Sequence, residues 1–596
     1  MRGPRAAACV VLAVGAAAGA ARADDDEYRP TYSRYELESI HDALKTLGGA
    51  IDPRPRGKRI ERVDVVTLDV IEKRDPAPAF LNWFHVTSKH EVIAREVLQK
   101  EGERFDPALV EETCRNLRAK PQLSLVLCLA LRGSRPDTVR VLVITKDVWS
   151  IRLNWNFLYA DGKLQQLILQ PSETNLLGTH QVIAAPNFDL ENDTVSLGGT
   201  YANPRFWGSW ISTAVSGGVI VNRATGQAEG NFGSFSWGQP LYSTRVAWAW
   251  GGSVSWRYEV TRRYVGGNLA YYDAPSTEGD DTIPWVYTSD ILNGGYSVTR
   301  SFGEHVKHNF ELGFGASRNV FRVPPSNDPY AFVDPHVEAQ AVADFTKNEV
   351  PVSDTRIGPY LTYHTFENRY MSVLNFNALG LQEDVQLGHE AWLRLQPVLK
   401  AWGSSRDFLA FFAGASYTWR LGDGLVRGYA QTSLDLAKGL PDATFSGGGR
   451  LETPTTPLGR LVLDSVVVDR WHDYLNTQSS LGGGDRLRGY PSNEFQGQSF
   501  FAANFEFRTR PLEILTLETA ACVFFDVGDA FTDWNQLLLK HDVGAGLRMS
   551  LPQLNRLVFR LDWGFPLTPV PGVPSPWPGN FVITFGQAFG MPGTAP

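Results

Sequence analysis

The chain has 596 residues, of which 43% are hydrophobic and 12% aromatic, and its formal net charge is −8 at pH 7. This negative charge, without any basic stripe interleaved with aromatic residues, argues against nucleic-acid binding. After residue 23 no stretch of about 18 residues runs without a charge, so no transmembrane helix is predicted. The mean hydropathy of −0.20 suits a soluble protein. It suits a transmembrane β-barrel equally well, because barrel strands are apolar on one face only.

The first residues have the layout of a secretory signal peptide. Arg2 and Arg5 precede an apolar run over residues 6–20, and Ala21-Arg22-Ala23 supplies small residues for a cleavage site. The apolar run is short for a membrane-spanning helix. We therefore predict that residues 1–23 are a signal peptide and that the mature chain is exported.

Residues 24–57 are predicted to form a linker with one short amphipathic helix. Apolar side chains recur there at near-helical spacing, at Tyr35, Leu37, Ile40, Leu44 and Leu47. The pair Gly48-Gly49 is a typical end for such a helix. Two interpretations follow: a mobile or plug-like element, or a helix packed on the next domain, which is favoured.

Residues 58–147 predict one small α+β domain with the element order β-α-α-β-β. The expected elements are a strand over 62–70, a helix over 87–99, a helix that starts at Pro107, and strands over 123–131 and 138–144. A three-stranded sheet has at least one open edge, whose unpaired N–H and C=O groups can bind an extended client strand. The alternative is a spacer that only positions the next domain.

Two cysteines fall within this small domain. Cys114 and Cys128 are in an exported chain, where disulfides form and persist. They are either a disulfide or two buried thiols, and the sequence leaves both interpretations open.

From residue 149 onward a two-residue alternation replaces the helical pattern. Between Arg245 and Tyr258 the even-numbered side chains are aromatic or apolar, apart from one glycine, and the odd-numbered ones are small or charged. A transmembrane barrel turns such an apolar face toward lipid. Residues 149–589 therefore predict a mainly β fold, an antiparallel transmembrane β-barrel. At roughly 25–30 residues per strand and connection it would have about 16 strands.

Longer stretches interrupt the alternation at four places. Residues 259–284, 322–350, 484–497 and 564–579 are predicted to be extracellular loops. Six prolines in 566–578 make that stretch unsuitable for extending the sheet. Residues 590–596 are predicted to be a C-terminal tail beyond the barrel.

Two short motifs offer a cation and a carboxylate. Residues 485–490 read Asp-Arg-Leu-Arg-Gly-Tyr and place Arg488, Gly489 and Tyr490 in one predicted loop. Further along the chain, Phe524-Phe525-Asp526-Val527-Gly528 contains Asp526 and Gly528 in a predicted strand. A guanidinium fork suits a bidentate contact with a carboxylate, which fixes orientation as well as charge.

Strand alternation places the carboxylate of the second motif. If Asp526 faces the lumen, Phe524 and Cys522 face it too, whereas Phe525 and Val523 face outward. Polar groups then fall inside and apolar side chains outside, as a wall in contact with lipid requires. The pattern therefore points Asp526 into the barrel.

Together the two motifs resemble the loop-six and strand-thirteen signatures of the POTRA-plus-barrel outer-membrane superfamily. That superfamily includes the BamA- and TamA-like bacterial surface antigen family and the two-partner-secretion transporters. The element order of residues 58–147 likewise resembles a POTRA domain. The resemblance implies that Arg488 descends with its loop and meets Asp526 inside the barrel. We call Arg488, Gly489, Tyr490, Asp526 and Gly528 the latch.

The last predicted strand runs from Phe581 to Phe589 and places Phe581, Phe585 and Phe589 on one face. A terminal strand that ends in Phe resembles the recognition signal of outer-membrane barrels. We expect function to reside in the seam between this strand and the first strand, about 149–158. Gly586 either weakens closure of the seam, because it lacks a side chain to pack, or provides steric room in the lumen.

The resemblance implies an outer-membrane protein with its POTRA domain in the periplasm, which assembles or inserts other outer-membrane proteins without a cofactor. The alternatives are a translocator that secretes a dedicated partner and a passive channel. Expected partners are outer-membrane lipid and strands of client β-barrel or secreted proteins. Periplasmic chaperones and an inner-membrane or lipoprotein partner are further candidates. The chain has no common hydrolase, metalloprotease or nucleotide-binding motif, so no enzyme activity is predicted. Its single POTRA domain departs from assembly factors, which usually carry more.

Overall fold

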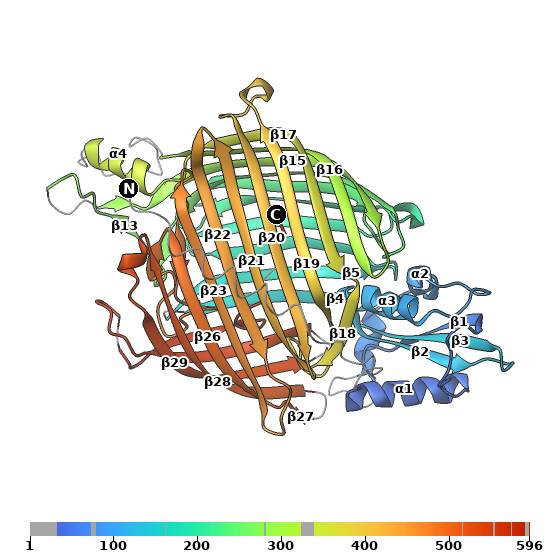
Figure 1. Ribbon diagram of the computed structural model, residues 1–596. Helices are drawn as coiled ribbons and strands as arrows, with labels where there is room; N and C mark the ends of the chain where they lie inside the picture. The colour runs from blue at the N-terminus through green and yellow to red at the C-terminus, as the bar shows by residue number, and fades with distance from the viewer. Residues whose placement is uncertain are drawn as a thin grey trace. The chain divides into compact units, whose positions relative to one another are not determined.

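The computed structural model describes residues 32–72, 79–160, 162–278, 282–323, 339–514, 517–551, 555–573, 575–590 and 595–596. The predicted signal peptide, the first part of the linker, and residues 591–594 of the tail lie outside these ranges. An N-terminal α+β module, residues 32–147, precedes a large β-barrel (Figure 1). No helix of the described part is both long enough and apolar enough to cross a membrane.

The N-terminal module has one leading helix followed by the order strand, helix, helix, strand, strand. Its elements are α1 (Arg34–Leu47), β1 (Arg59–Leu68), the short 3-10 helix η2 (Ala79–Phe84), α2 (His90–Glu96), α3 (Pro107–Arg118), β2 (Leu123–Arg132) and β3 (Thr138–Asp147). The helix expected over 87–99 is thus limited to the seven residues of α2.

The leading helix α1 begins at a capping box. Ser33 Oγ accepts a hydrogen bond from the Glu36 N–H, and Glu36 Oε2 accepts one from the Ser33 N–H. Burial raises the pKa of the Glu36 carboxyl to about 7. The apolar stripe of α1, including Ile40 and Ala43, packs on the side chains of β2 and β3. Of the two interpretations for this helix, the structure shows the packed one.

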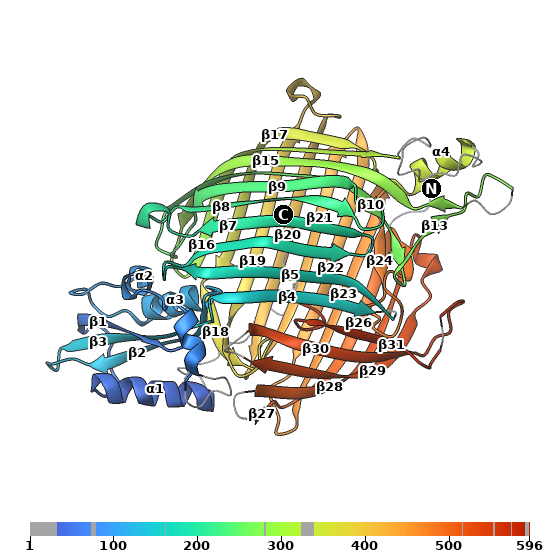
Figure 2. The same ribbon diagram turned by 180° about the vertical axis from the view of Figure 1, so that it is seen from behind.

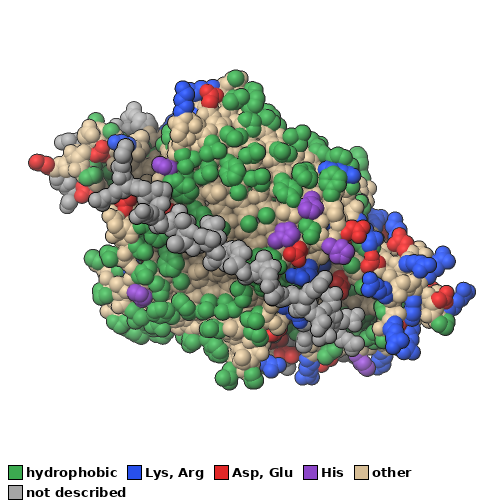
Figure 3. Space-filling view, in the orientation of Figure 1, with side chains coloured by type: hydrophobic (Ala, Val, Ile, Leu, Met, Phe, Trp, Pro, Cys, Tyr) green, Lys and Arg blue, Asp and Glu red, His purple; other side chains and the backbone are tan. Residues whose placement is uncertain are grey.

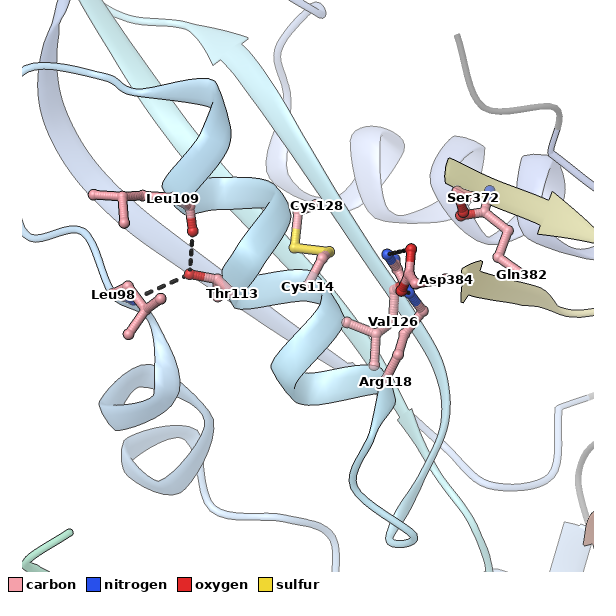
Figure 4. The surroundings of a disulfide bond; sticks show 10 residues. All are labelled: Leu98, Leu109, Thr113, Cys114, Arg118, Val126, Cys128, Ser372, Gln382 and Asp384. Carbon is pink, nitrogen blue, oxygen red and sulfur yellow. Dashed lines mark hydrogen bonds and ion pairs between the residues drawn. A yellow bond between two sulfur atoms is a disulfide. The ribbon is translucent and has the colours of Figure 1, made fainter. Parts of the chain in front are cut away.

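The three strands of the module form one sheet in the order β1-β3-β2, with β1 parallel and β2 antiparallel to β3. α2 and α3 cover the face of the sheet opposite α1, through Ile93, Val110 and Leu117. Cys114 of α3 and Cys128 of β2 form a disulfide, with their Cα atoms 6.0 Å apart (Figure 4). The disulfide therefore ties this helical layer directly to the sheet.

The two edges of this sheet differ in how far they are covered. Along β2, residues 50–52 form backbone hydrogen bonds with residues 130–132. Along β1, residues 102–105 bond only to the beginning of the strand, as far as Ile60. No strand in the described part of the module pairs with the outer edge of β1 from Arg62 to Leu68. The second half of β1 is therefore an open edge.

The barrel is a closed antiparallel sheet (Figures 1 and 2). Its strands are β4 (Ile151–Ala160), β5 (Lys163–Leu176), β6 (Gln181–Glu191), β7 (Thr194–Asn203), β8 (Ser212–Asn222), β9 (Ala228–Gln239), β10 (Trp248–Arg262), β15 (Val286–Phe302), β16 (Val306–Arg322), β17 (Asp354–Glu367), β18 (Arg369–Leu374), β19 (Gln382–Val398), β20 (Phe408–Leu421), β21 (Gly424–Ala437), β22 (Gly439–Glu452), β23 (Gly459–Asp473), β26 (Ser499–Thr509), β27 (Leu512–Ile514), β28 (Leu517–Phe531), β29 (Lys540–Leu551), β30 (Asn555–Pro566) and β31 (Asn580–Phe585).

The prediction of about 16 strands is wrong. β17 and β18 both pair with β19, and β26 and β27 both pair with β28, so each of these two pairs makes one interrupted strand. The wall therefore has 20 strands. The estimate failed because many connections are much shorter than assumed, such as those at 161–162, 192–193 and 422–423.

The outer wall of the barrel is apolar, as the alternation predicts. On β10, Trp248, Val254, Trp256 and Tyr258 are exposed on one face. In Figure 3, hydrophobic side chains cover much of the visible barrel wall, whereas charged side chains gather on the N-terminal module. An apolar surface of this extent suits lipid, because in water it would be expected to aggregate.

The connections that contain the four predicted long loops leave the wall at the end of the barrel away from the start of β4. They follow β10, β16, β23 and β30, which run in the same direction as β4. Residues 279–281, 324–338 and 574 of these loops lie outside the described ranges, and residues 259–262 and 564–566 belong to β10 and β30. These connections contain the short strand pairs β11 (Tyr264–Val265) with β12 (Asn268–Leu269), β13 (Tyr271–Tyr272) with β14 (Ile283–Pro284), and β24 (Ser479–Leu481) with β25 (Phe495–Gly497), as well as helix α4 (Ala339–Asn348). The other elements are the short 3-10 helices η3 (Phe206–Gly208), η4 (Lys400–Trp402) and η5 (Trp534–Gln536).

We predict that the Cys114–Cys128 disulfide stabilises the module against unfolding. The two residues are 14 positions apart, and closing a loop of this size contributes about 3 kcal/mol. Both cysteines are replaced with Ser in the full-length protein, and cleavage of residues 32–147 by a protease is measured at increasing urea concentration. The urea midpoint, the concentration at which half of the module is cleaved, should be lower than for the wild type. Cys522→Ser, which removes a buried free thiol of the barrel, is the control and should leave that midpoint unchanged. Equal midpoints for the wild type and the double variant would contradict the prediction.

Candidate functional site

The loop between β24 and β25 enters the barrel and places Arg488 against the inner face of the C-terminal strands. The Arg488 side chain is fully buried. Its Nε lies 2.8 Å from Asp526 Oδ2 and its Nη2 lies 3.0 Å from Asp526 Oδ1. The contact is bidentate, which fixes the orientation of the loop as well as balancing charge.

Two further carboxylates contact the same guanidinium. Arg488 Nη1 lies 2.8 Å from Glu506 Oε2 on β26 and 3.2 Å from Asp562 Oδ2 on β30. The ring of Phe524 lies 3.5 Å from the guanidinium carbon and covers its face. Arg488 therefore joins one loop to three different strands.

The carboxylates are in turn shared with neighbouring arginines of the wall. Arg508 Nε lies 2.8 Å from Glu506 Oε1, and Arg548 Nη1 lies 2.6 Å from Asp562 Oδ1. All of these side chains are buried. Burial of charges is tolerated where each charge has opposite partners and hydrogen bonds, so this cluster is a mutually dependent unit.

Close contacts with the barrel wall explain the other two latch residues of this loop, Gly489 and Tyr490. A Cβ on Gly489 would lie 2.6 Å from Asp542 Cβ and 3.0 Å from the Phe565 carbonyl carbon, so only glycine fits there. Tyr490 is buried, and its hydroxyl lies 2.9 Å from the carbonyl oxygen of His541 and 3.0 Å from that of Thr568. Glycine thus lets the loop approach the wall, and tyrosine holds it there by a hydrogen bond.

On the strand side, Asp526 and Gly528 are both in β28. Asp526, Phe524 and Cys522 are buried, whereas Val523 is 56% exposed and Phe525 37%. The predicted assignment of inward and outward faces is thus observed. Gly528 lies against the adjacent strand, where an added Cβ would be 2.7 Å from the carbonyl oxygen of Phe501. The structure therefore brings together all five residues of the latch motifs in one region of the lumen wall.

The latch loop also contacts the last strand of the barrel. The side-chain amide of Asn580, the first residue of β31, lies 3.2 Å from the carbonyl oxygen of Arg488 and 2.9 Å from that of Tyr490. The position of β31 therefore depends directly on the loop that Arg488 holds.

The seam between β31 and β4 is weakly paired. One register pair, Ile583 with Tyr159, joins the two strands, whereas β31 has six such pairs with β30. On the outer side, the ring of Phe585 packs edge-on against Trp155 at 4.9 Å. The seam therefore has far fewer backbone hydrogen bonds than other junctions in the wall.

The terminal strand is shorter than predicted. Phe581 and Phe585 lie within β31, but the strand ends at Phe585 and Phe589 is not part of it. Gly586 has φ of +91°, a left-handed conformation that favours glycine, and a Cβ there would meet nothing within 4 Å. Steric room does not account for this glycine; its left-handed backbone allows the chain to leave the wall.

Beyond Gly586 the chain places Phe589 among arginines. Phe589 is buried, and its ring lies 5.4 to 5.9 Å from the guanidinium carbons of Arg450, Arg486 and Arg508. Arg450 Nη2 also donates a hydrogen bond to the carbonyl oxygen of Phe589. Cation–π contacts of this kind hold Phe589 against β22, β26 and the loop that contains Arg488.

A family-model comparison and a search of curated proteins find no match to this chain. Among solved structures it is similar to BamA of Haemophilus ducreyi lacking POTRA domains 1–3, with 12% identity, 94% of each chain covered and a TM-score of 0.36. It is also similar to CdiB of Escherichia coli, with 12% identity over 93% of this chain and 83% of that one and a TM-score of 0.41. The FrpB iron transporter of Neisseria meningitidis matches with 9% identity over 94% of this chain and 97% of that one, and a TM-score of 0.35.

Sequence reasoning identified the two motifs but not their shared partners. Glu506 on β26 and Asp562 on β30 lie outside both motifs in the sequence. No spacing in the sequence relates either residue to Arg488. Alternation within β26 places Glu506 on the polar face, which was the one available signal. Among the described residues, no group of three or more His, Cys, Asp or Glu side chains is arranged to hold a metal ion.

We predict that Arg488→Ala destabilises the barrel strongly. The substitution leaves Asp526, Glu506 and Asp562 without their shared cation, and breaking a buried ion pair in this way costs about 3–5 kcal/mol. Thermal unfolding in detergent, followed by tryptophan fluorescence, should show a clearly lower Tm. Arg488→Lys should fall in between, because it restores the charge but not the bidentate geometry.

The matched control for this measurement is Arg318→Ala. Arg318 Nη1 lies 2.8 Å from Asp290 Oδ2 in the same barrel, but both side chains are more than 40% exposed. Exposed pairs contribute about 0–1 kcal/mol, so the Tm should barely change. If Arg488→Ala and Arg318→Ala lower the Tm equally, Arg488 has no special structural role.

Proposed function

We propose that this chain is an outer-membrane protein that assembles or inserts other outer-membrane proteins through the seam between β4 and β31. The observation that carries the proposal is the single register pair between these two strands. Strand edges that lack neighbours present N–H and C=O groups that can pair with an incoming strand. A client strand can therefore be aligned by β4 or β31 while it enters the membrane.

The lumen side of the seam offers space for such a strand. A cavity of about 640 Å³ is lined by Leu158 of β4, by Thr584 of β31, and by residues 484–486 of the loop that contains Arg488. Seam, cavity and latch loop are therefore adjacent. In this proposal Arg488 holds the loop, and the loop positions β31 through Asn580.

We further propose that β1 of the POTRA-like module is a first binding site for clients in the periplasm. Its edge from Arg62 to Leu68 is open, whereas residues 50–52 cover part of the edge of β2. An extended client segment would therefore add next to β1, by β-augmentation.

A second candidate function is secretion of a dedicated partner through the lumen. A cavity of about 530 Å³ on the inner wall, lined by small residues such as Gly251, Ser253 and Ser297 together with Arg394, favours this alternative. Small side chains leave room for a polypeptide to pass. The same module edge would then bind the secreted partner.

Crosslinking the seam tests whether it must open. Cysteines at Tyr159 and Ile583, directly opposite each other across β4 and β31, should form a disulfide in a Cys522→Ser background. We expect the oxidised variant to lose activity and to regain it on reduction.

The control pair for this experiment lies in a continuous part of the wall. Val426 and Leu451 are directly opposite on β21 and β22, which share a long ladder. A disulfide there should leave activity unchanged. Full activity of the Tyr159–Ile583 crosslinked form would exclude lateral opening.

Depletion of the protein in its native bacterium separates the two functions. Loss of many outer-membrane barrel proteins at once, restored by the wild type but not by the crosslinked variant, would support assembly. A normal barrel inventory with loss of one secreted protein would support secretion instead. High conductance in planar bilayers that Arg488→Ala does not alter would favour a passive channel.

A further inference from the structure

A short 3-10 helix of the module has two chemically distinct faces. In η2 and the residues directly after it, Phe80, Trp83 and Val86 are 51%, 83% and 48% exposed. Side chains three residues apart in a 3-10 helix lie above one another, so Phe80 and Trp83 share one face, which Val86 extends. Such a large exposed aromatic and aliphatic surface is unusual where only water is in contact.

The opposite face of this segment is fixed by hydrogen bonds. The side-chain amide of Asn82 bonds to both the N–H and the carbonyl oxygen of Ile71, at 3.0 and 2.8 Å. His85 Nε2 lies 3.1 Å from Asp147 Oδ2, and His85 Nδ1 lies 3.1 Å from Ser150 Oγ. Asn82 therefore fixes η2 to the chain just after β1, and His85, directly after η2, is fixed where β3 ends and the first barrel strand begins.

Ser150, His85 and Asp147 are connected in the same order as the residues of a Ser-His-Asp catalytic triad. Here these contacts position η2. Ser150 is fully buried, and its Oγ also lies 3.1 Å from Glu173 Oε2, so no substrate carbonyl can reach it. The next turn of the barrel adds to the attachment, since Ser88 Oγ bonds to His180 Nε2 at 2.8 Å. Burial lowers the pKa of His180 to about 4, so the ring is neutral at pH 7.

The segment that carries the exposed face lies near the start of β4, because His85 contacts Ser150. Ile151 directly follows Ser150, and Ile151 and Leu153 are 55% and 53% exposed on the outer wall. The Lys89 N–H donates a hydrogen bond to the carbonyl oxygen of Gly178, in the turn after β5. Leu177 in the same turn is also exposed. The first residue of a membrane-spanning strand lies at the bilayer interface, where aromatic side chains are enriched.

We propose that Phe80, Trp83 and Val86 form a membrane-interface anchor that inserts into the lipid headgroup and upper acyl region beside β4. The partner is a lipid surface, because the face lies near the start of the lipid-facing wall and carries an aromatic pair without charge of its own. The anchor holds the module at a fixed place next to the seam. This inference rests on the proposed insertion of the barrel into a membrane.

The test measures the depth of a fluorophore in phosphatidylcholine vesicles. The full-length protein, with Cys522→Ser, carries an environment-sensitive label at Val86→Cys, which leaves Phe80 and Trp83 in place. Lipids with a nitroxide on the headgroup or deep in the acyl chain act as quenchers. We expect stronger quenching by the headgroup nitroxide than by the deep one, as for a group at the interface.

Two label sites serve as controls. Leu312→Cys lies on the outer face of β16, where the native side chain is 65% exposed, and reports insertion of the barrel itself. Ser134→Cys lies in the exposed turn between β2 and β3, roughly 30 Å along β3 from Asp147, and should not be quenched. Phe80→Ser combined with Trp83→Ser should lower quenching at position 86 at least twofold, with the Leu312 signal unchanged.

The outcomes distinguish this inference from the proposed function. A label at position 86 that is no more quenched than the one at 134, while 312 is quenched, would overturn the anchor alone. Loss of quenching at 312 as well would overturn membrane insertion and the anchor together. If the label at 86 is shielded only after an unfolded barrel protein is added, the surface binds protein and the lipid proposal is wrong.

Discussion

A single buried guanidinium connects the parts of the barrel on which the proposed activity depends. Arg488 comes from a loop that starts at the far end of the barrel, and it contacts carboxylates of β26, β28 and β30 in the lumen. The loop then contacts the first residue of β31 through Asn580. Each of these carboxylates is buried and is low in energy only when a cation is paired with it. The loop is therefore held in the one position that places Arg488 beside all three carboxylates.

The weak seam is best understood against the rest of the wall. β21 and β22 are paired along nearly their full length, and all six residues of β31 pair with β30, so β31 is able to form a regular ladder. The register with β4 is lost because the strand ends at Phe585 and the chain turns inward at Gly586. The contacts across this seam include one backbone register pair, the ring contact of Trp155 with Phe585, and a 3.4 Å hydrogen bond from Thr584 Oγ1 to Asn156 Oδ1.

Much of this fold is readable from the sequence, and the failures are instructive. Alternation assigns the inner and outer faces of β10 and β28 correctly, because the pleat has a strict period of two and lipid selects one face. It does not determine where strands end, so the strand number and the place of Phe589 were both missed. Contacts such as Arg488 with Glu506 or His85 with Asp147 depend on register and on long-range closure, which no local pattern encodes.

The inward turn at Gly586 has a consequence for how the barrel can change shape. For β31 to lengthen and zip further along β4, the residues after Gly586 must return to the wall, and Phe589 must leave its arginine surroundings. Lengthening of β31 would therefore exchange the cation–π contacts of Phe589 for backbone pairs with β4.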